Sequence, residues 1–210
     1  PTGAVLSTAA LAAVEALCAE RGLALVGDEV FADAALRPPP SVAAVRGCLA
    51  FHLSGLSKVC GLPQVKAGWI AAAGPEALVA PALERLEVVL DAALSVSGPA
   101  QLALPRLLAA RETFLAPLRA RLATNRAALA APRGAPWDVL ASGGGWTAVL
   151  RVRETLDEEG LALALLDDGV AVSPGFFFDF ARSGHLVLSL LPRPATFAEG
   201  LGRVAARLSA

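Results

Sequence analysis

The chain has 210 residues, of which 55% are hydrophobic and 18% charged, and its formal net charge is −1. This length can bury a sizeable core in one or two domains, whereas a near-neutral chain with Arg and Glu intermixed lacks the basic surface that nucleic acid requires. The longest uncharged stretches, such as 92–105, are too short and too interrupted by Ser, Gly and Pro to span a membrane, and no signal peptide is visible.

Cysteine and histidine usage narrows the chemistry further. Three cysteines, Cys18, Cys48 and Cys60, and two histidines show no metal-ligand spacing, so we predict no metal. An odd cysteine count favours a reducing, cytoplasmic location. Because the chain contains no methionine, we expect it to be a piece of a longer protein.

The first 73 residues alternate between one helix and short apolar segments. Ser7 is placed to cap a helix over Ser7–Arg21 that Gly22 ends. Strands of the buried, parallel kind are then predicted at Leu23–Val26, Cys48–Leu53 and Ala67–Ala73. Asp28 follows the first strand and Ser57-Lys58 the second, which places both at the sheet edge where open α/β folds bind ligands.

From Pro75 onward the apolar residues repeat with helical spacing. Glu76–Leu90 predicts one helix, and an Ala/Leu/Arg-rich region over Ala100–Ala131 predicts further helix that Pro105 and Pro117 should start or kink. Pro132–Pro136 should end it.

The remaining residues predict a compact α+β unit. Strands are expected at Trp146–Val152, Val170–Val172 and Leu186–Leu191. Capping boxes formed by Thr155 with Glu158 and by Thr196 with Glu199 should open two helices.

Two loops of this unit have unusual composition, Gly143–Trp146 and Pro174–Phe178. One interpretation is that they hold turn glycines and core aromatic residues, which is the ordinary fate of such side chains. The other is that they line a substrate entrance.

Lysine usage singles out one segment. Lys58 and Lys66 are the only lysines among 18 basic residues, and they stand within nine residues of each other. An amine forms an imine with a carbonyl, which a guanidinium cannot do. Lys58 is therefore either a candidate for covalent chemistry or an ordinary solvated charge.

A spaced motif around these lysines favours covalent chemistry. It consists of Ser57-Lys58, Gly61-Leu62-Pro63, Lys66 and Gly68-Trp69. This motif resembles the lysine signature of pyridoxal-phosphate-dependent aminotransferases of class I/II, which have the aspartate aminotransferase fold. Pro1-Thr2-Gly3 resembles the end of that family's Asn-Pro-Thr-Gly turn, and the stretch 27–31 resembles its Asp-Glu-x-Tyr strand end.

The resemblance covers the whole chain but only the second half of such an enzyme. It implies an α/β fold in which residues 1–105 form the C-terminal part of the cofactor-binding large domain, a mostly parallel sheet with helices. Residues 106–210 would hold the interdomain helix and an α+β small domain. It also implies a homodimer in the full-length protein, and we expect the fragment alone to be inactive.

The resemblance also implies roles for five residues. Lys58 would hold pyridoxal 5'-phosphate as an imine and move the substrate proton. Asp28 would keep the ring nitrogen protonated, and Ser57 and Lys66 would bind the phosphate. Phe31 stands where the family commonly has a tyrosine whose hydroxyl donates to the cofactor, and phenylalanine has no such donor.

Two more positions depart from the family pattern. Lys66 replaces an arginine, which keeps the charge but loses the bidentate geometry. Val187, two residues before Ser189, stands where the family usually has the arginine that binds the substrate carboxylate. Arg182 and Arg193 flank this strand, and each is either a substitute for that arginine or a solvated surface charge.

Three functions remain open. The first is an aminotransferase that moves an amino group between an amino acid and a 2-oxo acid. The second is a non-catalytic, aminotransferase-like regulatory domain, and the third is a lyase that uses the same lysine for β-elimination. Retention of Lys58 and Asp28 favours catalysis.

Overall fold

The computed structural model describes residues 1–93, 95–130, 135–152 and 157–209. The chain divides into two compact units. The first unit is Val5–Leu115, and the second unit is Pro1–Ala4 together with Ala116–Ala210. In the described ranges, no helix is long and apolar enough to cross a bilayer.

The first unit opens with the predicted helix. Helix α1 spans Thr8–Arg21, the Ser7 hydroxyl oxygen accepts a hydrogen bond from the Ala10 N–H at 3.1 Å, and Gly22 ends the helix in the left-handed conformation at φ 62°. Both termini therefore follow the chemistry that the sequence predicts.

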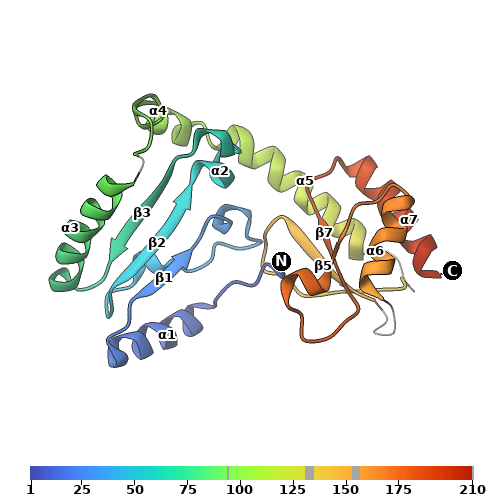
Figure 1. The fold of residues 1–210 in the computed structure, drawn as a ribbon, viewed down its shortest axis with the longest axis horizontal. Helices are drawn as coiled ribbons and strands as arrows, with labels where there is room; N and C mark the ends of the chain where they lie inside the picture. Colours follow the sequence, from blue (N-terminus) through green and yellow to red (C-terminus); the bar gives the residue numbers. More distant parts are fainter. Residues whose placement is uncertain (94, 131–134, 153–156, 210) are drawn as a thin grey trace. The chain divides into compact units, whose positions relative to one another are not determined.

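A three-stranded sheet lies at the centre of the first unit (Figure 1). Its strands are β1 Leu25–Asp28, β2 Ala50–Gly55 and β3 Gly68–Ala73, each beginning one or two residues later than predicted. The strand order is β1-β2-β3, with β1 parallel to β2 and β3 antiparallel to β2. The expectation of a mostly parallel sheet is therefore wrong for this part of the fold, where the sheet is mixed.

One face of this sheet is covered and the other is open. Leu11 and Cys18 of α1 pack with Val42, Cys48 and Ala50 to form a core. On the opposite face of β1, the side chain of Val26 is 59% exposed. The prediction that β1 is buried on both faces is therefore wrong within this chain, because the described residues supply a covering layer on one side only.

Helices follow the sheet. They are α3 Glu76–Ala92, α4 Gly98–Ala109 and α5 Glu112–Ala130. Pro105 lies inside α4 and Pro117 inside α5, so neither starts a helix, which was one of the two predicted outcomes. The break falls between α4 and α5, and the predicted helix end at Pro132–Pro136 lies largely outside the described residues.

The second unit is an antiparallel sheet with helices, as predicted (Figure 1). The strand order is β4-β5-β7-β6, formed by Asp138–Val139, Thr147–Arg151, His185–Ser189 and Ser173–Pro174. Helices α6 Glu158–Asp167 and α7 Pro194–Ser209 complete it. Fully buried side chains form its core, namely Leu150, Leu165, Leu186, Leu190 and Val204.

The strand predicted at Val170–Val172 is instead β6, three residues later. The Val170 N–H bonds back to the Leu165 carbonyl at 2.8 Å, and Gly169 has φ 77°. These residues belong to the C-terminal cap of α6, so the chain becomes extended only after the cap.

The two predicted capping boxes are not the caps that form. Asp157 caps α6 by accepting from the Glu159 N–H at 3.1 Å, and Thr155 lies outside the described residues. Helix α7 begins at Pro194, before Thr196, and Glu199 pairs with Arg203 instead of the helix start. Both boxes were predicted from spacing alone, and a proline at the first helical position is an alternative start signal.

Glu158 is a buried carboxylate, only 6% exposed, that organises the second unit. Its Oε1 accepts from the His185 N–H at 2.7 Å and its Oε2 from the Phe176 N–H at 2.9 Å. It therefore joins α6 to the start of β7 and to the 3₁₀ turn η4, Gly175–Phe178.

Replacing Glu158 with alanine should destabilise the second unit by about 2–4 kcal/mol, because two backbone N–H groups would lose a charged acceptor. Glu158→Gln keeps one acceptor oxygen and should cost about half as much. Glu159→Ala, at an exposed neighbour in the same helical turn, should change stability by less than about 0.5 kcal/mol. Calorimetric unfolding of the protein measures all three, and equal effects of Glu158→Ala and Glu159→Ala would contradict the assignment.

Candidate active site

Asp28 stands at the carboxyl end of β1. The parallel register pairs Asp28 with Leu53 of β2, and the Glu29 N–H donates to the Leu53 carbonyl at 3.0 Å. The Asp28 side chain is on the exposed face of the strand, where its Oδ1 accepts a long 3.3 Å hydrogen bond from the Val30 N–H. The carboxylate is therefore available to a ligand at the sheet edge.

Lys58 lies in the short helix that directly follows β2. Helix α2 spans Leu56–Val59, and its two terminal residues are buried, so Ser57 and Lys58 are left half-buried at the surface of the turn. The Lys58 Nζ lies 5.7 Å from the centroid of the Phe31 ring, within cation–π distance. The structure therefore brings Lys58 together with the segment that follows Asp28.

Lys66 lies at the same end of the first unit's sheet as Lys58, because the start of β3 pairs with the end of β2. It follows the 3₁₀ turn Pro63–Val65 and has a left-handed backbone at φ 57°, unusual for a residue with a side chain. The Leu56 N–H donates to the Ala67 carbonyl at 3.0 Å, which fastens the start of α2 to the residue after Lys66. Lys66 itself is exposed.

Close steric contacts explain why glycine occupies two positions of the lysine motif. Gly61 has φ 65°, and a Cβ built there would lie 2.5 Å from the Phe114 ring. A Cβ at Gly68 would lie 3.0 Å from the Ser54 carbonyl oxygen. The loop around Lys58 thus depends on close packing that larger residues would disrupt.

A carboxylate–imidazole pair supports this end of the sheet and was not predicted. The Oε1 of Glu29 accepts from the Val42 N–H at 2.7 Å, and its Oε2 lies 3.3 Å from His52 Nε2. The two side chains are 15% and 18% exposed. The pair joins the end of β1 to β2 beside Asp28. Two sequence features could have indicated this pair: Glu29 adjoins Asp28, and His52 is one of two histidines in the chain.

These side chains suit a phosphorylated aldehyde that carries a basic ring nitrogen. Lys58 offers an amine for the aldehyde, Asp28 a carboxylate for the ring nitrogen, and Ser57 and Lys66 a hydroxyl and a cation for the phosphate. Phe31 lies against Lys58 but brings no hydroxyl. Asp28 is the last residue of β1, and the other four come from the segments that follow β1 and β2.

The second unit holds the other predicted positions. Val187 is 5% exposed and is paired with Val149 and Ser173 inside the sheet. Arg182 and Arg193 are exposed. The three phenylalanines of η4 are also exposed, by 49%, 66% and 41% for Phe176, Phe177 and Phe178, so the prediction of core aromatics is wrong.

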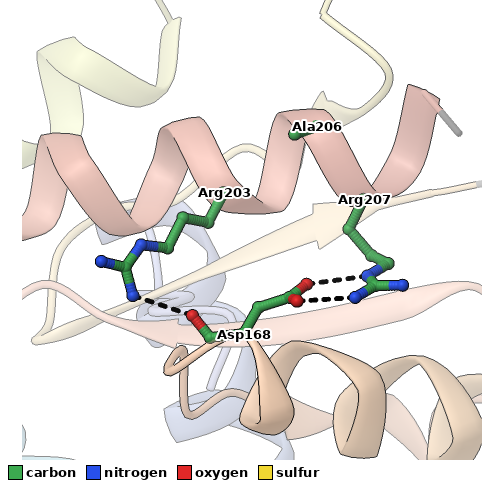
Figure 2. Close-up of a pocket in the computed structure, with 4 residues that line it drawn as sticks. All are labelled: Asp168, Arg203, Ala206 and Arg207. Carbon is green, nitrogen blue, oxygen red and sulfur yellow. Dashed lines mark hydrogen bonds and ion pairs between the residues drawn. The ribbon is translucent and has the colours of Figure 1, made fainter.

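A surface hollow between α6 and α7 has another role (Figure 2). Its carboxylate, Asp168, receives two hydrogen bonds from Arg207, at 2.6 and 2.8 Å, and Arg203 donates to the Asp168 carbonyl at 2.8 Å. The Arg207 hydrogen bonds hold the pKa of Asp168 below its usual value. These groups satisfy one another and join two helices, which is a structural role.

In the described ranges, no group of three or more His, Cys, Asp or Glu side chains is placed to hold a metal ion. The cysteines are unpaired, and burial raises the pKa of the Cys48 and Cys60 thiols. Neither thiol is set up as a nucleophile.

The family model "Aminotransferase class I and II" matches residues 1–201. Solved structures show the same fold. An aminotransferase from Escherichia coli has 21% sequence identity and a TM-score of 0.82, with 100% of this chain and 55% of that chain covered. Aspartate aminotransferases from Thermotoga maritima and Thermus thermophilus have identities of 20% and 25% and TM-scores of 0.81 and 0.77. They align over 100% and 99% of this chain and 54% of each of theirs.

The chain belongs to the class I and II aminotransferase family. It spans about half the length of the solved structures that it matches. No protein of curated function matches it in sequence.

Proposed function

We propose that the full-length protein is a pyridoxal-phosphate-dependent aminotransferase that moves an amino group between an amino acid and a 2-oxo acid, with Lys58 as its covalent residue. One observation carries this proposal: the Lys58 Nζ lies 5.7 Å from the Phe31 ring, at the sheet edge where β1 ends in Asp28. This contact supports the proposal that the amine and the carboxylate serve one site at the ligand-binding edge of the α/β sheet.

Each residue has a defined task. When bound, pyridoxal phosphate accepts electrons from the substrate Cα. The Lys58 Nζ attaches the cofactor and then carries a proton to and from the substrate. The Asp28 carboxylate holds the proton on the ring nitrogen, and Ser57 and Lys66 bind the phosphate. The Phe31 ring packs beside the lysine, and its lack of a hydroxyl leaves the phenolic oxygen without that donor.

The chain is further proposed to be the C-terminal half of this enzyme. Its coverage of 54–55% of related structures supports this placement. Under this proposal, residues 1–105 belong to the large domain and residues 106–210 to the interdomain helix and small domain. The full-length enzyme is proposed to be a cytoplasmic homodimer.

A β-lyase would use the same lysine, and a regulatory domain would need none of the chemistry. The exposed Asp28 carboxylate, held by one long bond, is what a catalytic cofactor site requires. Product analysis separates the candidates, because an aminotransferase releases a 2-oxo acid without ammonia whereas a β-lyase releases ammonia.

Borohydride reduction of the full-length protein tests the proposal. The visible absorbance of the bound cofactor should disappear, and peptide mapping should find the cofactor fixed on Lys58. An adduct on Lys66, or none, would remove Lys58 from its proposed role.

The fragment alone should bind the cofactor weakly and transfer no amino group. One face of its sheet is open, as the 59% exposure of Val26 shows, and exposed apolar faces and strand edges favour association. Titrating purified residues 1–210 with pyridoxal phosphate measures this directly. A saturable absorbance band at about micromolar cofactor, together with amino transfer, would show that the site is complete in this chain.

A further inference from the structure

Glu29 is a largely buried carboxylate that the proposed mechanism does not use. It directly follows Asp28, and side chains along an extended backbone alternate between the two faces of a sheet. Asp28 lies on the open face with Val26, whereas Glu29 bonds to Val42, a member of the core on the covered face. The Glu29 side chain is 15% exposed, and a charge so far removed from water needs fixed partners.

Three contacts hold Glu29 in place. Its N–H donates to the Leu53 carbonyl at 3.0 Å, and its Oε1 accepts from the Val42 N–H at 2.7 Å. Its Oε2 lies 3.3 Å from His52 Nε2, within ion-pair distance. The bond from Val42 is charge-assisted, which makes it stronger than a bond between neutral groups. The residue after Asp28 is therefore fixed through both its backbone and its side chain.

The residue before Asp28 is held from the same direction. Val42 begins the 3₁₀ turn η2, Val42–Ala44. A Cβ built on Gly27 would lie 2.7 Å from Val42 Cγ2 and 2.8 Å from its Cγ1, so the valine side chain packs directly on the glycine backbone. Val42 thus contacts both neighbours of Asp28, Gly27 through its side chain and Glu29 through its N–H.

Asp28 has weak support of its own. Its side chain is exposed, and its Oδ1 accepts the long 3.3 Å hydrogen bond from the Val30 N–H. The direction of the carboxylate therefore depends on the backbone to either side. A functional group needs supporting residues that hold it within about 0.5 Å of its productive position, and a displacement of about 1 Å can slow a reaction about 10²-fold.

We propose that Glu29 is a positioning residue for Asp28. Held by the Val42 N–H and by His52, it fixes the backbone at the end of β1 and so aims the Asp28 carboxylate at the ring nitrogen of the cofactor. This inference rests on the proposed function, in which Asp28 keeps that nitrogen protonated. Glu29 lies on the opposite face of the strand and acts through Asp28.

A double-mutant cycle in the full-length protein tests the proposal. Glu29→Ala should lower kcat about 5- to 30-fold, because the Asp28 backbone is no longer fixed. In a protein that already carries Asp28→Ala, the same substitution should change kcat by less than about twofold, since the group that Glu29 positions is gone. Glu29→Gln keeps an acceptor for the Val42 N–H, so its kcat should stay within about threefold of the wild type.

Hydrogen exchange in the cofactor-free protein gives a readout without turnover. Glu29→Ala should raise the exchange rate of the Glu29 N–H about tenfold or more, because the end of β1 opens more often. Asp28→Ala should change that rate by less than about twofold. Titration with pyridoxal phosphate should show about 3- to 10-fold weaker binding by Glu29→Ala, and no further loss when this substitution is added to Asp28→Ala.

Glu15→Ala is the matched control. The Oε1 of Glu15 also accepts from two backbone N–H groups, those of Arg46 and Gly47 at 2.9 and 2.6 Å. These residues precede β2 and lie at the opposite end of the parallel pair from Asp28. Glu15→Ala should lower the unfolding temperature about as much as Glu29→Ala does, yet leave kcat and cofactor affinity within about twofold of the wild type.

The outcomes separate the inference from the proposed function. If Glu29→Ala costs the same factor with and without Asp28→Ala, or if Glu15→Ala is equally slow, Glu29 only supports the fold and the inference is overturned. A normal kcat in Glu29→Ala beside a slow Asp28→Ala overturns the inference alone. A normal kcat in Asp28→Ala overturns the role of Asp28 in the proposed function, and the inference with it. If Glu29→Ala fails to fold, Glu29→Asp, whose shorter side chain cannot keep both contacts, decides in the same cycle.

Discussion

Replacing Lys58 with alanine in the full-length protein should abolish the visible absorbance of the bound cofactor and lower the rate of amino transfer by at least about 10⁴-fold. The variant loses both the amine that attaches the cofactor and the group that moves the proton. Since Lys58 is half-buried and its helix is held by Leu56 and Val59, the fold should survive the change. Absorbance spectra and single-turnover assays measure the two losses.

Two further variants, one at Lys58 and one at Lys66, distinguish loss of the amine that attaches the cofactor from loss of a positive charge. Lys58→Arg keeps the cation beside the Phe31 ring but cannot attach the cofactor, so it should be as inactive as Lys58→Ala. Lys66→Ala should instead retain the absorbance at saturating cofactor and bind the cofactor less tightly, because it loses only a phosphate contact. Residual transfer within about tenfold of wild type in Lys58→Ala would exclude Lys58 as the proton carrier.

Replacing Asp28 with alanine should leave the cofactor attached but slow turnover by about 10²- to 10³-fold, because the ring nitrogen would lose the carboxylate that holds its proton. The side chain is exposed and accepts one long hydrogen bond, so stability should change by less than about 0.5 kcal/mol. Spectroscopy, thermal unfolding and kcat together distinguish these effects.

Asp28→Asn tests the charge with little change in shape and should be nearly as slow as Asp28→Ala. Asp91→Asn, at an exposed position on α3, is the control and should behave as wild type. An unchanged kcat in Asp28→Ala would remove this residue from the mechanism.

Local chemistry made much of the fold predictable. The cap of α1 at Ser7, its left-handed end at Gly22, and the parallel pairing of β1 with β2 follow from residue types and spacing. The same reasoning placed Asp28 and Lys58 at one sheet edge, because strands that run parallel end on the same side.

The errors arose where distant contacts decide the outcome. Val26 is exposed because nothing in the described chain covers its face, which a buried-strand pattern cannot reveal. Thr196 and Glu199 have the spacing of a capping box, yet the helix starts at Pro194. The pairing of Glu29 with His52 joins residues far apart in sequence and leaves no periodic signal.

Val187 shows the same limit. Its departure from the family pattern was visible in the sequence, whereas its burial inside the sheet, where it is 5% exposed, was not.

The Gly143 N–H donates to the Gly3 carbonyl at 2.9 Å, and the Thr147 hydroxyl donates to the Pro1 carbonyl at 2.8 Å. This attachment of Pro1–Gly3 to the region of the Gly143–Gly145 loop has a consequence for how the protein is made. The second unit is assembled from two segments that are separated in the chain by the whole of Val5–Leu115. On the ribosome, the Pro1–Gly3 turn is synthesised first and must wait for its partner loop, which at about 5–20 residues per second takes roughly 7–30 s. Throughout that interval the chain of the first unit is synthesised, and the second unit can be completed only after residues 143–145 have been made.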